Sequence, residues 1–278
     1  NPNGGVVMKL SSNLDYLKPY KSDLVRVGPE GDCGYVIPRS VADKTNGMYS
    51  VGISTNWEFE VEMAIRNPKI RIQAFDRTSG WTVFAYVAFR DLLRGDPSEA
   101  EKMAITARFK SAFHYLNLSV KFRIFFSGRK KFERKWVRES SSSKSEVSFA
   151  DSTQGLFDED EVMLKIDIEG GEYELSESLI ECLKKNSKRI NSVVMEFHET
   201  RIRRNEFEYL VRGISSVVPI VHIHGINCVV VAPDGLPEVI EITFAKDCEI
   251  SFSDNLSFPL AGLDFPNDKA LPDLSFTF

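Results

Sequence analysis

The sequence predicts one α/β domain, a mainly parallel β-sheet with helices on both faces, finished by antiparallel strands at the carboxyl end. Two observations support this fold class. Short apolar runs alternate with helical patterns along most of the 278 residues, and two of those runs end in an acidic residue, at Asp76 and Asp167. No repeat and no linker divides the chain, so we expect a single domain.

Apolar periodicity and glycine positions predict the elements of the first half. In order, they are a short helix over 9–24, a hairpin over 24–38, a strand from 47 that runs into a small-residue loop over 52–56, a helix over 57–66, a strand over 70–76, a helix over 98–115 and a strand over 120–126.

Residues 128–146 are basic and rich in serine, which predicts an exposed hairpin or a mobile loop. Because a charge run is usually a solvated face, nucleic-acid binding is the weaker interpretation of this segment. Two other roles of this segment stay open: it could cover an active site or attract an anionic substrate.

The second half predicts a regular alternation of strands and helices. In order, these are a strand over 162–168, a helix over 173–186, a strand over 190–198, a helix over 202–215, strands over 217–224, 227–232 and 239–244, and a surface tail over 258–278 rich in Pro and Asp. Within the single domain over 1–278 we therefore expect an N-terminal helix and hairpin over 1–45, a core over 46–250 and a C-terminal tail over 251–278.

The composition is that of a globular protein with an ordinary core, at 42 % hydrophobic residues. A formal charge of −5 and a pI near 5.6 disfavour an extended nucleic-acid surface. No apolar stretch approaches the ~20 residues needed to span a bilayer. Four widely separated cysteines without a CxxC pair predict free, mostly buried thiols and a cytoplasmic setting. The start at Asn1, without an initiator Met, suggests a processed product or a domain excised from a longer polypeptide.

The run from Val162 to Tyr173 carries the strongest signal of chemistry. An apolar strand ends there in Asp167, Glu169 and Glu172, with two glycines between them. The carboxyl ends of strands are where open α/β sheets bind ligands. Carboxylates lose solvation at such a place unless they meet a cation, a donor or a proton. A structural alternative is that Glu172 merely begins the next helix, where the macrodipole favours an acid.

Two loops of the first half have the properties of a nucleoside site. Gly52 opens a loop of small residues that lets a ligand approach the backbone at a helix start. Asp76 ends the next strand, where a carboxylate can accept hydrogen bonds from both ribose hydroxyls. Neither GxGxxG nor GxxxxGK[ST] occurs, so a cofactor with a ribose but no phosphate fits best.

At this point the chain resembles the FkbM-like S-adenosylmethionine-dependent methyltransferases. The resemblance rests on four stretches in the expected order within about residues 24–200, namely Arg26 to Tyr35, Tyr49 to Gly52, Phe75-Asp76 and Leu164 to Glu172. It implies a Rossmann-like class I methyltransferase fold and the cofactor S-adenosyl-L-methionine. It also implies that the Gly52 loop lies near the methionine part and that Asp76 binds the ribose. The expected cofactor-binding residues are Arg26, Gly52, Ser54, Asn56 and Asp76.

The same resemblance bears on the substrate and the setting. The family mostly methylates oxygen, often a sugar hydroxyl, which implies a sugar or glycan acceptor. Some such domains are parts of larger proteins with glycosyltransferase modules, including proteins of large algal viruses, for which the setting would be the host cytoplasm. The chain departs from the family pattern at Cys33, where a glycine is more usual, and at the loop after Gly52, which lacks repeated glycines.

Methyl transfer to a hydroxyl requires positioning and control of a proton. Asp167 and Glu169 follow one strand, and Glu196 and His198 lie two apart at the end of the next. These four are the expected catalytic residues. Asp167, Glu196 and His198 would also suit Mg²⁺ or Mn²⁺ as ligands. Two alternatives stay open, a metal-free general base with His198 as the first candidate, and a structural role for Glu196 and His198.

The sequence therefore favours an S-adenosylmethionine-dependent O-methyltransferase acting on a carbohydrate hydroxyl. Its rivals are methylation of a small-molecule or lipid hydroxyl, and a methyltransferase fold that only binds a partner. Nucleic-acid methylation is the weakest rival, because the sequence has no Asn/Asp-Pro-Pro-aromatic motif and no Pro-Cys. His222 and His224, two apart on a predicted strand, are more typical of packing residues than of ligands.

Overall fold

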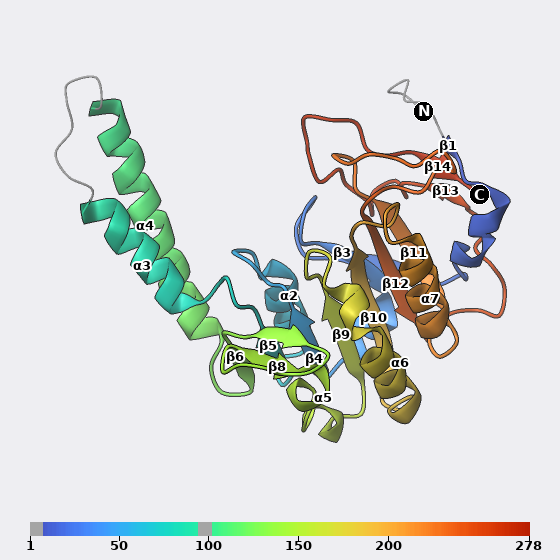
Figure 1. Cartoon of the computed structure of the whole chain (residues 1–278), viewed down its shortest axis with the longest axis horizontal. Helices are drawn as coiled ribbons and strands as arrows, with labels where there is room; N and C mark the ends of the chain where they lie inside the picture. Colours follow the sequence, from blue (N-terminus) through green and yellow to red (C-terminus); the bar gives the residue numbers. More distant parts are fainter. Residues whose placement is uncertain (1–7, 94–101) are drawn as a thin grey trace.

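The computed structural model describes residues 8–93 and 102–278 (Figure 1). Its centre is a seven-stranded sheet in the order β11-β12-β10-β9-β4-β5-β6. The strands are β4 (Gly47–Val51), β5 (Arg71–Phe75), β6 (Lys130–Glu133), β9 (Val162–Ile166), β10 (Ile190–Phe197), β11 (Ile220–Gly225) and β12 (Ile240–Ala245). Every pair of neighbours from β10 to β6 is parallel, and β12 is antiparallel to both β10 and β11. The predicted fold class, a Rossmann-like α/β fold with a mainly parallel sheet, helices on both faces and antiparallel pairing at the carboxyl end, is confirmed.

The strand order creates a switch point beside β4. The chain leaves β4 for β5 on one side and returns to β9 on the other. In the register, Val51 lies opposite both Phe75 and Ile166, so the carboxyl ends of these three strands align. Open α/β sheets bind their ligands at such a point.

Two hydrophobic cores, one on each face, hold the sheet between its covering layers. One face carries α5 (Phe149–Ser152), α6 (Ser176–Lys185) and α7 (Arg204–Ser215), packed on alternate strand residues such as Val193 and Met195. The other carries α1 (Arg39–Lys44), α2 (Glu58–Arg66) and the hairpin of β2 (Leu24–Val27) and β3 (Tyr35–Pro38), packed on residues such as Met163 and Val194. The buried spacing Phe207, Leu210, Val211 and Ile214 is the apolar stripe that docks α7.

Further elements lie around this body. α3 (Trp81–Leu93) and α4 (Lys102–Phe125) form an antiparallel pair that projects away from it (Figure 1). β7 (Trp136–Arg138) pairs in parallel with β8 (Glu146–Ser148), and β1 (Met8–Lys9), β13 (Ser257–Phe258) and β14 (Phe276–Thr277) form a small sheet that joins the two ends of the described chain. The 3-10 helices are η1 (Ser12–Leu17), η3 (Leu156–Asp158) and η4 (Glu172–Leu175). No helix among the described residues is both long enough and apolar enough to cross a membrane.

The region between β5 and β6 departs most from prediction. The expected strand over 120–126 is wrong, because α4 continues to Phe125. Its aromatic residues resemble a strand, but Ser119 and Phe122 are buried at helical spacing beside α3. The whole of α3 is an additional helix, and residues 98–101 of the helix predicted over 98–115 lie outside the described residues.

Three smaller predictions also require correction. The helix over 9–24 is instead β1 and η1, which ends before Pro19, a residue that cannot continue a helix. The strand over 227–232 reduces to one bridge between Val231 and Pro237 around a turn. Part of the basic segment is not a loop, because Lys130–Glu133 forms the edge strand β6 of the main sheet. All four cysteines lie in the described chain and are free, as predicted, but Cys228 is exposed and the other three are half-buried.

Candidate functional site

A pocket of about 460 Å³ opens at the switch point, over the carboxyl ends of β4, β5 and β9. Its walls come from the loops after these strands, from β7 and from the loop after β10. The lining residues are Val51, Gly52, Ser54, Phe75, Asp76, Thr78, Lys135, Trp136, Val137, Arg138, Asp167, Ile168, Glu169, Gly170, Gly171, Glu174 and Glu199. The size is that of a small-molecule site.

Gly52 is required by the close approach of two loops. Its φ is +78°, and a Cβ at this position would lie 1.4 Å from the carbonyl oxygen of Asp167. The buried Lys165 ammonium donates to the Gly52 carbonyl at 2.7 Å. The loop after β4 is thus pressed onto the loop after β9, so the predicted cofactor loop and the acidic run share one pocket.

Asp76 organises the other side of the pocket. Its Oδ2 accepts the Ser54 N–H at 2.8 Å, and its Oδ1 accepts both the N–H and the hydroxyl of Thr78 at 2.7 Å. The Ser79 N–H donates to Oδ1 as well. Oδ2 therefore carries one donor and keeps lone-pair capacity toward the pocket that it lines.

Two residues expected to bind the cofactor lie elsewhere. Arg26 is not among the lining residues, and its guanidinium donates to the carbonyls of Pro29, Gly31 and Leu263. It is therefore a brace between the β2–β3 turn and the tail. Asn56 is also absent from the lining, because its side chain accepts the Glu58 N–H at the start of α2.

One wall of the pocket comes from the basic segment over 128–146, none of whose residues was named as a site residue from the sequence. Lys135, Trp136 and Arg138 line the pocket, and Arg138 pairs with Glu174 at 2.9 Å. The only sequence signal was the charge run itself, for which covering an active site was one of the open interpretations. Trp57, which precedes α2, is not among the lining residues and is buried against Phe84 and Phe122.

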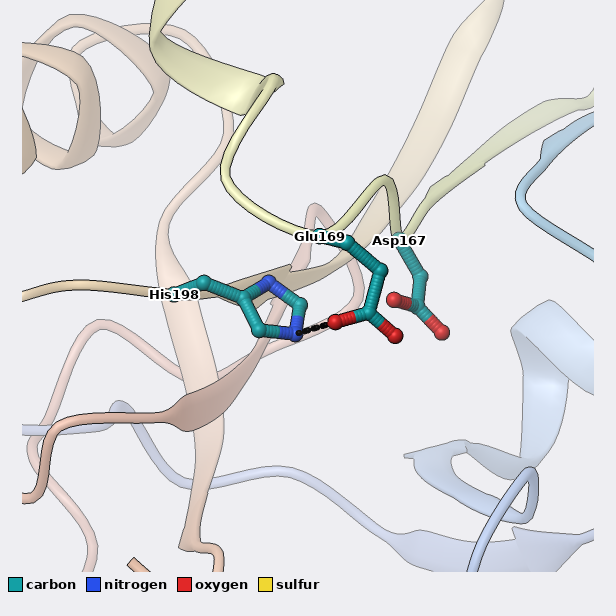
Figure 2. Close-up of side chains that lie close together, drawn as sticks. All are labelled: Asp167, Glu169 and His198. Atoms are coloured by element: carbon teal, nitrogen blue, oxygen red, sulfur yellow. Dashed lines mark ion pairs between the residues drawn. The ribbon is translucent and has the colours of Figure 1, made fainter.

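Figure 2 shows the side chains of Asp167, Glu169 and His198 close together. Asp167 and Glu169 line the pocket, and His198 lies beside them but is not among the lining residues. One ligand atom from each lies within 4.8 Å of the others. Asp167 and Glu169 follow β9, and His198 follows β10. His198 Nε2 lies 3.5 Å from Glu169 Oε2 and 3.1 Å from Glu196 Oε1. All four residues expected to be catalytic are therefore brought together.

Glu172 orients His198 from behind. It begins η4, and it is also fully buried, with its Oε1 2.8 Å from His198 Nδ1. The same oxygen accepts the Ile168 and Gly170 N–H groups, whereas Oε2 is buried without a partner. Because Glu172 engages Nδ1, Nε2 is directed toward Asp167, Glu169 and Glu196.

The proton affinities of this cluster are shifted. Burial, increased by repulsion from Asp167, raises the pKa of Glu196 to about 8. Burial also raises the pKa of Asp167 to about 6, against the attraction of Lys165. For His198, burial lowers the pKa, but hydrogen bonds to Glu172 and Glu196 outweigh it and raise the pKa to about 11. Such a concentration of shifted groups beside a pocket is typical of functional sites.

The loops after β9 and β10, which carry the cluster, have an unusual backbone. Glu169 has a φ of +53° and Glu199 a φ of +54°, although neither is glycine. Arg203 donates to the Gly170 carbonyl at 2.9 Å and lies over the ring of Tyr173, whose hydroxyl donates to the His198 carbonyl. Left-handed conformations of acidic residues persist where the surroundings enforce them, often at ligand sites.

No protein-family model and no curated protein matches this sequence. Solved structures with partial likeness include a fibrillarin pre-rRNA processing protein from Methanococcus jannaschii, with 11 % identity, coverage of 75 % of this chain and 70 % of that one, and a TM-score of 0.32. A precorrin-6y C5,15-methyltransferase from Geobacter metallireducens has 12 % identity, coverage of 74 % and 83 %, and a TM-score of 0.33. A 16S rRNA adenine methyltransferase from Catenulisporales acidiphilia has 8 % identity, coverage of 83 % and 100 %, and a TM-score of 0.29. At such values neither activity nor substrate transfers to this chain.

Proposed function

We propose that this protein is an S-adenosylmethionine-dependent O-methyltransferase that methylates a sugar hydroxyl. The observation that carries the proposal is the shared pocket, which Gly52, Asp76, Asp167 and Glu169 all line, with His198 grouped with the last two. The class I fold, with its strand switch at the same place, supports it.

The residues present fit the cofactor. Asp76 would accept hydrogen bonds from the ribose, and the loop from Gly52 to Ser54 offers a backbone that a ligand can approach closely. Phe75 and Trp136 supply apolar surface for a nucleobase. When bound, S-adenosylmethionine supplies a methyl group with a good leaving group, which leaves this chain to orient the acceptor and handle its proton.

The residues present also fit a divalent cation such as Mg²⁺ or Mn²⁺. Asp167 and Glu169 offer oxygen atoms and His198 a ring nitrogen, with Glu196 beside them. Glu172 would act as the outer carboxylate that orients a ligating histidine. The cation would lower the pKa of the acceptor hydroxyl.

A metal-free base is the second candidate for this step. His198 is the weaker choice for it, because its carboxylate partners favour the protonated ring. Asp167, a member of the same cluster that also lines the pocket, is the better candidate for the base.

The charge of this edge supports a neutral acceptor. Asp167, Glu169 and Glu199 line the pocket where the acceptor would enter, and such a row of carboxylates disfavours a polyanionic nucleic acid. A sugar hydroxyl, hydrogen-bonded by carboxylates, fits this surface better than an apolar lipid does. As setting we propose the cytoplasm, and as parent protein one that carries glycosyltransferase modules.

Calorimetric titration with S-adenosylhomocysteine tests the cofactor site. Asp76→Asn should weaken binding by about 10- to 100-fold, because an anionic acceptor of the ribose hydroxyls is lost. Asp254→Asn, which changes an exposed aspartate that does not line the pocket, is the matched control. Melting temperatures of both variants identify any general loss of structure. No binding by the wild-type protein would favour the partner-binding alternative.

Transfer of labelled methyl to a panel of hexose and deoxysugar glycosides tests the acceptor and the metal together. We expect activity with Mn²⁺ or Mg²⁺ and its loss in EDTA. Full turnover in EDTA would refute the cation and favour the metal-free general base. Activity with RNA or with a lipid alcohol, but with no sugar, would refute the sugar acceptor and leave the methyltransferase assignment standing.

A further inference from the structure

The projecting pair of α3 and α4 exposes a continuous apolar face. A groove of about 320 Å³ runs along it, lined by Ala85, Ala88, Phe89, Leu92, Phe109, Ala112, Phe113 and Leu116. None of these residues lines the pocket of the proposed active site. This groove is a separate feature that methyl transfer does not explain.

The exposed side chains on α4 follow helix-packing spacing. Phe109, Phe113, Leu116 and Val120 are 4, 3 and 4 residues apart, the a/d pattern by which helices pack side by side. They are between 51 and 72 % exposed. α4 already uses its other side, including Ser119 and Phe122, against α3 and the body. The four exposed apolar side chains therefore form a second packing face of α4, which has no partner among the described residues.

The pair is built to keep this face in place. The Ser111 hydroxyl donates to Asp91 at 2.8 Å, and the Ser119 hydroxyl donates to the Trp81 carbonyl at 2.8 Å. These bonds join the helices at two levels. The two helices that carry the apolar face are thus held together by side-chain hydrogen bonds as well as by packing.

The exposed apolar area approaches what one partner contributes to a standard dimer interface. Phe89, Phe109 and Phe113 are 60, 61 and 72 % exposed, and Leu92 and Leu116 are each 51 % exposed. At about 200 Å² for a large apolar side chain, these five leave roughly 600 Å² of apolar surface in water. That is the top of the range of about 300–600 Å² for the largest apolar patch of a typical monomer, a size that is often functional. With Val120 and its neighbours it approaches the ~800 Å² per partner of a standard interface.

The shape of the face suits a second copy of itself. α4 presents a ridge of phenylalanines, while the alanines at 85, 88 and 112 form a hollow floor beside it. In a two-fold arrangement the ridge of each copy can enter the hollow of the other, as self-complementary interfaces require. We propose that two copies of this chain associate through this face, their helix pairs forming a four-helix bundle.

Sedimentation velocity over about 1 to 100 µM tests the proposal. The wild-type protein should sediment as a dimer, at twice the 31.5 kDa mass of the chain. Phe113→Asp should raise the dimer dissociation constant by about 100-fold or more, because each interface would bury two unpaired charges. Ile250→Asp is the matched control, since Ile250 is fully exposed on a loop far along the chain from the helix pair, and it should leave the dimer intact.

Circular dichroism checks that the variants are folded. A wild-type monomer at every concentration, or a Phe113→Asp variant that remains dimeric, would overturn the proposal. α4 also carries Lys110, Lys121 and Arg123, so vesicles containing phosphatidylserine are included. Binding of a monomer to these vesicles, abolished by Phe113→Asp, would assign the face to an anionic membrane instead.

Discussion

Among the residues of the site, Glu172 has the clearest separable role. It touches neither the pocket nor an exposed surface, yet it holds His198 Nδ1 at 2.8 Å. An acid that only began a helix would face solvent near the first turn. Its burial indicates that it positions His198.

Glu172→Gln tests this positioning role. The amide keeps the volume but cannot offer the same charged acceptor, so Mn²⁺ affinity should fall by about 10- to 100-fold in a calorimetric titration. In NMR titrations without metal, the raised pKa of His198 should move down toward its ordinary value. Glu177→Gln, an exposed acid on α6, serves as the control. An unchanged His198 pKa in Glu172→Gln would contradict the role.

At the scale of elements, the contact between the loops after β4 and β9 decides whether the pocket exists. Gly52→Ala places a methyl group on the Asp167 carbonyl, with 1.4 Å between Cβ and oxygen. We expect a loss of about 3 kcal/mol or more in the free energy of unfolding in urea, because both loops must move.

Gly128→Ala provides the matched comparison. Gly128 also has a positive φ, of +64°, but no atom lies within 4 Å of the position of its Cβ. Gly128→Ala should lower the free energy of unfolding by about 1 to 2 kcal/mol, because only the left-handed backbone conformation is penalised. Equal effects of the two substitutions would show that the loop contact adds nothing.

At the scale of the whole molecule, two buried histidines join the tail to the sheet. His222 Nε2 lies 3.2 Å from Asp264 Oδ2, and His224 Nε2 lies 3.1 Å from Asp273 Oδ1. Both residues lie on β11 and are 2 % exposed. They are structural, as their strand position predicted, and the carboxylates that pair with them come from the tail, about 40 to 50 residues later.

This junction predicts a dependence of stability on pH. Burial lowers the pKa of His224, but hydrogen bonds to Asp273 and Glu241 outweigh it and raise the pKa to about 10. The charged ring therefore stabilises the fold fully below its unfolded pKa of about 6.5, and the contribution is lost as the pH rises through about 10. For Asp264, burial raises the pKa, but the nearby His222 outweighs burial and the net pKa is lowered. The stabilisation by the Asp264 carboxylate is therefore lost only in acid.

Urea unfolding at about pH 7 and about pH 9 measures the effect. The wild-type free energy of unfolding should be lower at the higher pH, by on the order of 1 to 3 kcal/mol. His224→Gln should reduce this difference, whereas His114→Gln, on the exposed surface of α4, should preserve it. If His224→Gln keeps the full difference, the junction is not its source.

The sequence by itself determined the sheet strands near the site and the positions of Asp76 and Asp167 at their ends. Apolar alternation marks such strands, and parallel strands bring their carboxyl ends to one edge. Local signals of this kind need no knowledge of distant contacts.

Only the tertiary structure decided which side chains meet across long separations. In the structure Glu172 contacts His198, and Trp136 lines the pocket. Arg26 and Asn56, which were expected in the pocket, instead bond to backbone groups elsewhere. It also decided that residues 120–125 extend a helix, because Phe122 packs beside α3. The physical reason is the same in each case: such contacts depend on which faces the fold brings together, and local periodicity does not encode that.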